Sequence, residues 1–286
     1  MRSLSVTSLR RESKRQRCRL YNGLVDLGLR GKVALIAGAS QGIGRATAES
    51  FAAEGCNLAI CSRTAKALES AAQEIRKVHG VEVFCRALDV GDANAVKQFV
   101  AEVVARFGKI EICIANAGGP PVKGFLVTTH EDWQKALEQN FMSVVYLAQE
   151  VIPHMQRNRW GRFITLTSVT TKQPVPDLVL SNAVRMAVVG LVKSMANEFG
   201  KDGILVNNVA PGYTATGRLK ELAKSRAASQ GKKESEVFDA WAADTPLRRV
   251  AEPREVADTT VWLASERASF ITGQTVLVDG GTYKGL

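Results

Sequence analysis

The chain has 286 residues and is basic, with 38 Lys and Arg against 28 Asp and Glu and a formal net charge of +10. That length is enough for one large α/β domain with a sizeable core. Hydrophobic residues make up 45% and charged residues 23%, which excludes disordered, collagen-like and coiled-coil chains, and no uninterrupted apolar run approaches the roughly 18 residues of a membrane span.

The N-terminal segment carries most of the charge excess. Seven Lys and Arg stand there against Glu12 alone, so residues 1–23 hold +6 of the +10. The segment lacks the apolar core of a secretory signal, and we expect a disordered extension or an over-long translation start. Its Arg- and Ser-rich, acid-poor composition also suits a mitochondrial transit peptide or an arm that touches nucleic acid. We expect residues 24–286 to form one domain.

From residue 32 onward, short apolar runs alternate with longer amphipathic stretches. The runs are as long as strands, and most are apolar at consecutive positions, which is typical of strands covered on both faces. They are 33–37, 58–61, 83–88, 110–115, 163–167, 205–209 and 275–278. The helical stretches lie near 43–54, 65–79, 92–107, 131–157, 182–200 and 253–264. This alternation predicts a Rossmann-type, doubly wound α/β fold whose sheet is parallel and has helices on both faces.

One segment interrupts the alternation before the last strand. Residues 217–245 are rich in Ala, Lys and Glu. An insertion of this size near a sheet edge is a candidate lid over a cleft.

The cysteines and histidines follow no disulfide or metal-binding pattern. Cys56, Cys61, Cys85 and Cys113 lie in or beside strand-like runs, where we expect buried thiols, and Cys18 lies in the basic segment. There is no CxxC, and the three histidines are scattered. We therefore expect no metal site and a reducing, cytoplasmic location.

A glycine-rich loop follows the first strand and opens a helix near Ile43. Its glycines permit a tight turn and let the backbone approach a pyrophosphate, which the helix N-terminus then stabilises. The strand–loop–helix context favours a dinucleotide site over a purely structural turn. The candidate cofactor contacts in this loop are Gly38, Ser40, Gln41, Gly42, Ile43 and Gly44.

The GxxxGxG spacing of this loop resembles the short-chain dehydrogenase/reductase family, and further family landmarks follow in order along residues 28–286. By resemblance, Asp89 and Val90 contact the adenine, and Asn116-Ala117-Gly118 form the NAG element, with Ala115 where a second Asn is usual. Asn140 and Ser168 match two residues of the catalytic set, and Pro211-Gly212 and Thr216 match the motif beside the nicotinamide. Asp279-Gly280-Gly281 matches the C-terminal signature. The wider pattern, with Pro246, Arg249 and Gly273, is most similar to the 3-oxoacyl-[acyl-carrier-protein] reductases.

The end of the second strand indicates which dinucleotide is bound. An acidic residue there accepts hydrogen bonds from the adenosine ribose of NAD(H), whereas an Arg suits a 2′-phosphate. This chain has Ser62 and Arg63 and no acid. A hydroxyl and a guanidinium can both donate to a phosphate, so we expect NADP(H) rather than NAD(H). The alternative is that Arg63 is only a solvated residue at a helix start.

The catalytic set departs from the family. The resemblance implies a Tyr thirteen residues after Ser168, as the proton donor, and a Lys four residues later that lowers the pKa of the Tyr and holds the ribose. Those positions hold Ser181 and Arg185. A Ser hydroxyl is a far weaker acid than a Tyr with its free pKa near 10, and Arg185 stays charged. Arg185 can still bind ribose hydroxyls or stabilise an alkoxide, and Ser168 and Asn140 keep their matched places.

Three donors can replace the missing acid. Tyr213 follows the Pro-Gly pair on a loop expected near the nicotinamide, unless it only packs within the lid. Lys172 lies in the substrate-side loop, unless it is merely solvated. The third donor is a water held by Asn140, Ser181 and Arg185. A structural alternative makes Ser181 a helix cap and Arg185 a surface charge.

These observations leave three functions open. The first is an NADPH-dependent reductase of a 3-oxoacyl thioester or related carbonyl. In such a reductase, residues 217–236, which carry a net charge of +3, would attract an acidic acyl carrier protein or a CoA phosphate. The alternative is that these residues form only a solvated helix. The second is a dinucleotide-binding or regulatory protein without the chemistry. The third, nucleic-acid binding through 1–23, is favoured least, so we expect neither nucleic acid nor membrane as a partner.

The resemblance implies a homotetramer.

Overall fold

The structure is a computed structural model that describes residues 25–286. The expectations for the basic segment 1–23, including Cys18, therefore lie outside the described residues.

A seven-stranded parallel sheet forms the centre of the molecule, in the order β3-β2-β1-β4-β5-β6-β7. Its strands are β1 Val33–Ala37, β2 Asn57–Ser62, β3 Val83–Ala87, β4 Ile112–Ala115, β5 Gly161–Leu166, β6 Ile204–Pro211 and β7 Thr275–Val278. Every neighbouring pair runs parallel. The predicted Rossmann-type fold is confirmed.

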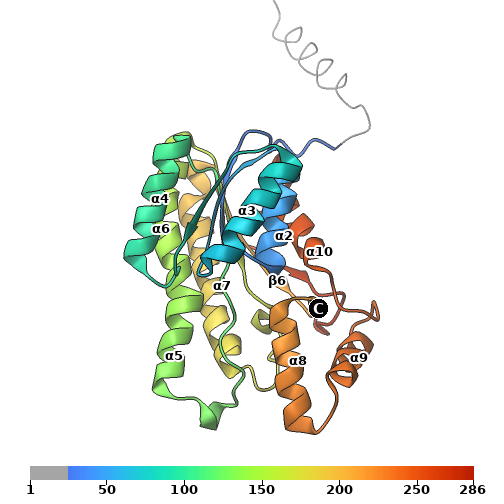
Figure 1. Cartoon of the computed structure of the whole chain (residues 1–286). Coiled ribbons are helices and arrows are strands. Elements are labelled where there is room, and N and C mark those ends of the chain that lie inside the picture. Colours follow the sequence, from blue (N-terminus) through green and yellow to red (C-terminus); the bar gives the residue numbers. More distant parts are fainter. Residues whose placement is uncertain (1–24) are drawn as a thin grey trace, which may run out of the picture.

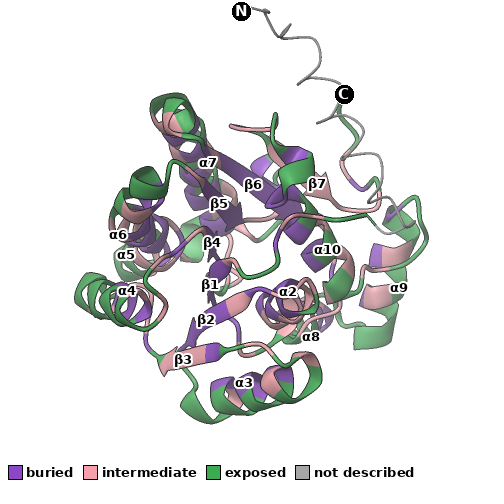
Figure 2. Cartoon of the chain, turned by 90° about the horizontal axis from the view of Figure 1, so that it is seen from above, coloured by how far each residue is buried: buried purple, intermediate pink, exposed green. Residues whose placement is uncertain are grey.

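Helices cover both faces of this sheet. Seen from above, α4, α6 and α7 lie on one face, and α2, α3 and α10 on the other (Figure 2). The helices are α2 Gly42–Ala53, α3 Ala65–His79, α4 Ala93–Phe107, α5 His130–Leu137, α6 Ser143–Asn158, α7 Val179–Phe199, α8 Gly217–Gln230, α9 Glu234–Asp244 and α10 Pro253–Leu263. The predicted candidate lid, 217–245, corresponds to α8 and α9, which lie together beyond one end of the sheet (Figure 1).

The strands are apolar at consecutive positions because successive side chains enter two different cores. Along β1, Val33, Leu35 and Ala37 pack into the core on the α4–α6–α7 side. Ala34 and Ile36 pack into the core on the α2–α3–α10 side. All five side chains are buried, so a polar residue at any of them would lie unsatisfied in a core.

Local sequence signals set several helix ends. The Asp92 carboxylate accepts from the backbone N–H of Asn94 and Ala95 at the start of α4, a cap that typically contributes about 1 kcal/mol. The helix ends at Gly108, whose φ of 75° is left-handed. Glycine adopts that conformation without steric cost.

The helical stretch predicted over 131–157 changes its helix type part-way along. Between α5 and α6 the chain forms a π-helical turn over Glu138–Met142, and Asn140 lies inside it. A π-turn adds a residue to the helical repeat, so it changes the direction of the side chains it carries. The helical stretch predicted over 131–157 is confirmed, and the π-helical turn within it is a detail for which the apolar period gives no sign.

One helix would also suit a membrane span by length and hydropathy alone. Residues Val179–Asp202, which include α7, meet that criterion among the described residues. Val184, Val188 and Val192 on this helix are buried in the protein core. The apolar character of α7 therefore serves the core of the α/β fold.

The cysteine prediction holds at three positions and was wrong at the fourth. Cys56, Cys61 and Cys113 are buried free thiols, and burial raises the pKa of Cys56 and of Cys61 to about 12. Cys85 is only partly buried, because β3 lies at the edge of the sheet. Its thiol donates to a Glu69 carboxylate oxygen at 2.9 Å.

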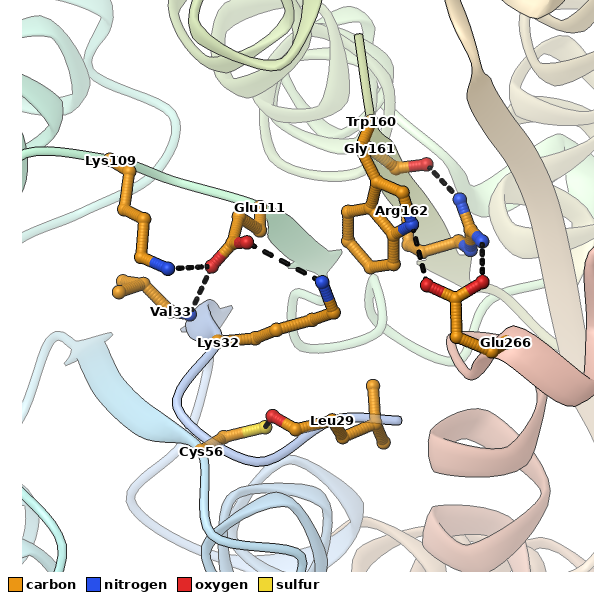
Figure 3. Close-up of polar contacts among 10 residues, drawn as sticks. All are labelled: Leu29, Lys32, Val33, Cys56, Lys109, Glu111, Trp160, Gly161, Arg162 and Glu266. Atoms are coloured by element: carbon orange, nitrogen blue, oxygen red, sulfur yellow. Dashed lines mark hydrogen bonds and ion pairs between the residues drawn. The ribbon is translucent and has the colours of Figure 1, made fainter. Parts of the chain in front are cut away.

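A polar cluster closes the sheet at the end where the strands begin (Figure 3). The Trp160 ring lies between two cations, with Lys32 Nζ 3.7 Å and the Arg162 guanidinium carbon 4.1 Å from its centroid. Its indole N–H donates to Glu266 at 2.9 Å. The cation–π contact with the Trp160 ring offsets part of the cost of burying the Arg162 charge.

Glu111 offers a test of this cluster. Its carboxylate accepts from the Val33 backbone N–H at 3.0 Å and pairs with Lys32 at 3.5 Å and Lys109 at 2.8 Å. We expect Glu111→Ala to lower the free energy of unfolding by about 2 kcal/mol, since it removes both charge and acceptor. Glu111→Gln keeps the acceptor and should cost about half as much. Urea denaturation measures both, and equal losses would show that the Val33 hydrogen bond contributes nothing.

Candidate active site

The cleft lies where the carboxyl ends of the strands meet, beside the β1–β4 pair. This is the position at which the strand order reverses, since β2 and β3 lie on one side of β1 and the later strands on the other, and doubly wound sheets bind ligands there. The cleft has a volume of about 350 Å³ and is lined by the loops after β1 to β6 and by the start of α8. Every predicted cofactor residue and every predicted catalytic residue except Asn140 lines it.

Close backbone approach shapes the glycine loop. Gly38 and Gly42 have left-handed φ values of 63° and 58°, and a Cβ on Gly44 would lie 2.2 Å from the Gly38 carbonyl oxygen. The Asn116 amide donates to the Ala37 and Gly38 carbonyl oxygens at 3.2 and 3.4 Å. The loop after β4 is thereby tied to the loop after β1, and the N-terminus of α2 is left open to a phosphate.

We expect Gly44→Ala to abolish measurable NADPH binding, because the added methyl must displace the backbone of Gly38. Gly190 is the matched control, since it lies within α7 and a Cβ there meets no atom within 4 Å. Gly190→Ala should keep full affinity and raise stability by up to about 1 kcal/mol. Titration calorimetry tests the pair, and wild-type affinity in Gly44→Ala would show that the close approach is not needed for binding.

The adenosine end of the cleft fits a phosphorylated ribose. The Ser62 side chain is buried, and its hydroxyl has no partner among the described residues. Arg63 lines the cleft beside it and is exposed. Asp89 lies after β3, where its oxygens accept from the Gly91 N–H at 3.0 Å and the Gln139 amide at 3.3 Å. The unpartnered Ser62 hydroxyl and the exposed Arg63 guanidinium can both donate hydrogen bonds to an anion.

Ser168 stands at the end of β5 with its hydroxyl proton available. Its Oγ accepts from the Thr170 backbone N–H at 3.2 Å, as the N-cap of a short helix over Val169–Thr171. The hydroxyl oxygen is thus fixed as an acceptor. Its proton can be donated to a substrate oxygen in the cleft.

Ser181 and Arg185 lie one turn apart on α7 and both line the cleft. The Ser181 hydroxyl is 3.2 Å from that of Thr170. Arg185 donates through Nη1 to the Leu166 carbonyl oxygen at 3.1 Å, and its buried Nε has no partner in the described chain. Both side chains are buried, and α7 begins two residues before Ser181. The alternative of a helix cap and a surface charge was therefore wrong.

Asn140 lies behind the cleft. Its amide donates to the Gly118 carbonyl oxygen at 2.7 Å, and its buried Oδ1 has no partner among residues 25–286. Asn140 and Arg185 both line a second cavity of about 10 Å³. That volume is about the size of one water molecule, and Asn140 Oδ1 and Arg185 Nε are the buried polar atoms of its lining residues that have no partner in the described chain.

Comparisons with known proteins agree with this geometry. The family model described as enoyl-(acyl carrier protein) reductase matches residues 38–283. The 3-oxoacyl-[acyl-carrier-protein] reductase of Staphylococcus epidermidis is 34% identical over 252 residues, which cover 88% of this chain and 99% of the relative. That of Vibrio cholerae is 34% identical over 90% of this chain and 99% of its own length. The chain belongs to the short-chain dehydrogenase/reductase family.

Solved members of the short-chain dehydrogenase/reductase family share the fold over nearly the whole chain. The L-sorbose reductase of Gluconobacter frateurii, complexed with NADPH and L-sorbose, superposes with a TM-score of 0.87 at 34% identity and covers 92% of this chain and all of its own. The actinorhodin polyketide ketoreductase with NADPH has a TM-score of 0.86 at 30% identity, covering 89% of this chain and 98% of its own.

Two of the three substitute donors for this short-chain reductase lie outside the cleft lining. Tyr213 stacks on Trp241, with ring centroids 5.1 Å apart, within the small core of α8 and α9. Burial raises the pKa of Tyr213, which makes it a weaker acid. Lys172 is exposed and does not line the cleft.

One charged residue of the cleft was not among those predicted from the sequence. Arg218 is the second residue of α8, and its guanidinium donates to the Pro120 carbonyl oxygen on the opposite loop. Pro120 and Arg218 both line the cleft. From the sequence, Arg218 is only one basic residue of the charged segment 217–236, because no local signal indicates which face of α8 meets the loop after β4.

Proposed function

We propose that this short-chain dehydrogenase/reductase, an NADP(H)-dependent oxidoreductase, reduces a 3-oxoacyl thioester or a related carbonyl with an atypical proton donor. The observation that carries the proposal is that Ser168 and Arg185 line the same cleft as the glycine loop. A hydroxyl donor and a fixed cation beside a dinucleotide site are the groups needed to stabilise a developing alkoxide.

The cofactor is held along the length of the cleft. NADPH, when bound, supplies a hydride. The backbone of the glycine loop and the N-terminus of α2 bind the pyrophosphate, and Ser62 and Arg63 bind the 2′-phosphate. Asp89 and Val90 bind the adenine end, while Asn116-Ala117-Gly118, Pro211-Gly212 and Thr216 enclose the nicotinamide end.

At the reacting end, Ser168 donates its hydroxyl proton in a hydrogen bond to the substrate carbonyl oxygen. Burial and the Arg218 charge lower the pKa of Arg185 to about 10. That value is still well above neutral pH, so Arg185 remains cationic. Its role is therefore to stabilise negative charge and to hold ribose hydroxyls, and not to transfer a proton.

The proton comes from water. Asn140 and Arg185 both line the small cavity, and Asn140 Oδ1 and Arg185 Nε are buried without partners in the described chain, which supports a water bound to these two atoms. Ser181, which lines the main cleft, completes the path to the substrate. A water polarised by a guanidinium is a poorer acid than a tuned phenol, which predicts slow turnover.

Surface cations, free thiols and exposed apolar side chains support the expected partners, location and oligomeric state of the protein. Exposed cations on α8 and after it, including Lys220, Lys224 and Lys232, support docking of an acidic acyl carrier protein. Free thiols at Cys56 and Cys113 support a cytoplasmic location. Exposed apolar side chains at Leu126 and Phe270 support association into a homotetramer.

The proposal is tested by following NADPH oxidation with acetoacetyl-CoA and a panel of small ketones. We expect turnover above the buffer rate, reduced about 10²-fold in Ser168→Ala through loss of one oxyanion donor. No oxidation with any carbonyl would defeat the enzyme proposal, and an unchanged rate in Ser168→Ala would defeat the role of Ser168.

The alternative is a dinucleotide-binding or regulatory protein of the same fold. It is favoured by the absence of a Tyr or Lys among the residues that line the cleft in the described chain. This alternative predicts tight NADPH binding together with no turnover in the same assay.

A further inference from the structure

We infer that the reacting end of the cleft contains a binding site for an anionic group of the substrate, formed by Arg185 and Arg218. The inference rests on the proposed function and narrows its substrate class. A short 3-oxo acid, whose free carboxylate is one methylene away from the reacting carbonyl, would fit this pair of guanidinium groups.

Arg185 supplies the buried half of the site. Its side chain is 7% exposed and lines the cleft, and its Nη1 donates to the Leu166 carbonyl oxygen. Burial and the charge of Arg218 lower its pKa. A buried guanidinium with a like-charged neighbour is stabilised when an anion binds.

Arg218 supplies the half that closes over the cleft from α8. Its Nη2 donates to the Pro120 carbonyl oxygen, and on the outer side its Nη1 lies 3.4 Å from Glu221. Gly119 makes room for this approach, since a Cβ there would lie 3.2 Å from Arg218 Nε. The guanidinium is therefore held against the cleft wall.

The charges of the cleft lining favour an anion at this end. Arg63, Arg185 and Arg218 line the cleft, against Asp89 as the acid among its described residues. Both Asp89 oxygens accept hydrogen bonds at the adenine end. Arg63 is committed to the ribose phosphate in the proposed function. Arg218 pairs on its outer side with the exposed Glu221, and the described residues provide no counter-ion for Arg185 inside the cleft. The planar fork of a guanidinium matches a carboxylate through paired N–H groups.

One other anion is available to these residues, namely the pyrophosphate of the cofactor. The glycine loop and the N-terminus of α2 already provide backbone donors for a pyrophosphate, whereas Arg218 contacts the loop after β4. The two sources make different predictions for cofactor affinity, and the experiment below separates them.

The test compares acetoacetate with methyl acetoacetate, a neutral ester of nearly the same shape. Titration calorimetry on the full chain loaded with NADP⁺ avoids turnover and measures binding alone. We expect the native chain to bind acetoacetate at least about tenfold more tightly, as one charge-assisted pair provides. Arg218→Gln should erase this preference and leave the dissociation constant of NADPH unchanged.

Arg254→Gln is the matched control, because Arg254 lies on α10, is exposed and does not line the cleft. It should retain the full preference for acetoacetate. Equal binding of acid and ester by the native chain would overturn the inference, as would an Arg218→Gln variant that keeps the preference but binds NADPH more weakly. Failure of the proposed function is a separate result, because it would appear as acetoacetate binding without NADPH oxidation.

Discussion

Ser181→Tyr/Arg185→Lys is expected to raise kcat/KM for acetoacetyl-CoA by about 10²-fold or more, within the range that general acid catalysis contributes. The two positions lie one turn apart on α7 and both line the cleft, so a phenol at 181 would stand beside an ammonium at 185. The nearby cation would lower the pKa of the Tyr from its ordinary value near 10. Steady-state NADPH oxidation by the native chain and the double variant measures the gain.

The matched control is Ser181→Phe/Arg185→Lys, which adds the same ring without its hydroxyl. We expect no gain in kcat/KM from this variant, and NADPH binding within a few fold of the native value would show that the cleft is intact. An equal gain in the Phe and Tyr variants would mean that filling space, and not proton donation, limits the native enzyme.

Arg63→Glu is expected to weaken NADPH binding by about 10²-fold and to reverse the preference between NADPH and NADH. The substitution removes charge-assisted hydrogen bonds to the 2′-phosphate, which contribute about 1.5–3 kcal/mol. It also places a carboxylate where it would repel that phosphate and accept from the ribose hydroxyls of NADH. Dissociation constants for both dinucleotides, measured by fluorescence titration, give the ratio directly.

Lys66→Glu controls for the general change in charge, since Lys66 lies in the first turn of α3 but does not line the cleft. Its effect on NADPH affinity should be small and should fade with added salt. Tighter binding of NADH than NADPH by the native chain would contradict the assignment of Ser62 and Arg63.

The sequence predicts the sheet and the cofactor loops because both depend on local signals. Consecutive apolar residues indicate strands buried on two faces, and β1 is buried in this way on both sides of the sheet. The spacing from Gly38 to Gly44 indicates a close backbone turn, and the structure places the Gly44 position against the Gly38 carbonyl oxygen. Each inference needs only a few neighbouring residues.

The parts that were missed or left open depend on contacts between distant segments. Arg218 meets Pro120 across 98 positions of the chain. For Tyr213 the sequence left lid packing and proton donation open, and its stacking on Trp241 favours lid packing. The π-turn around Asn140 interrupts a stretch whose composition suits one continuous helix. Tertiary packing decides the contact of Arg218, the place of Tyr213 and the π-turn, and no local sequence pattern indicates that packing.

The most direct test of the account is transfer of deuterium from NADPH deuterated at C4 of the nicotinamide to the product of acetoacetyl-CoA or acetoacetate, detected by mass spectrometry. We expect deuterium on the carbinol carbon with the native chain. Deuterium transfer should be slower with Ser168→Ala and faster with Ser181→Tyr/Arg185→Lys. Tight NADPH binding with no deuterated product from either substrate would contradict a reductase that works without the family's Tyr and Lys, and would leave the dinucleotide-binding alternative.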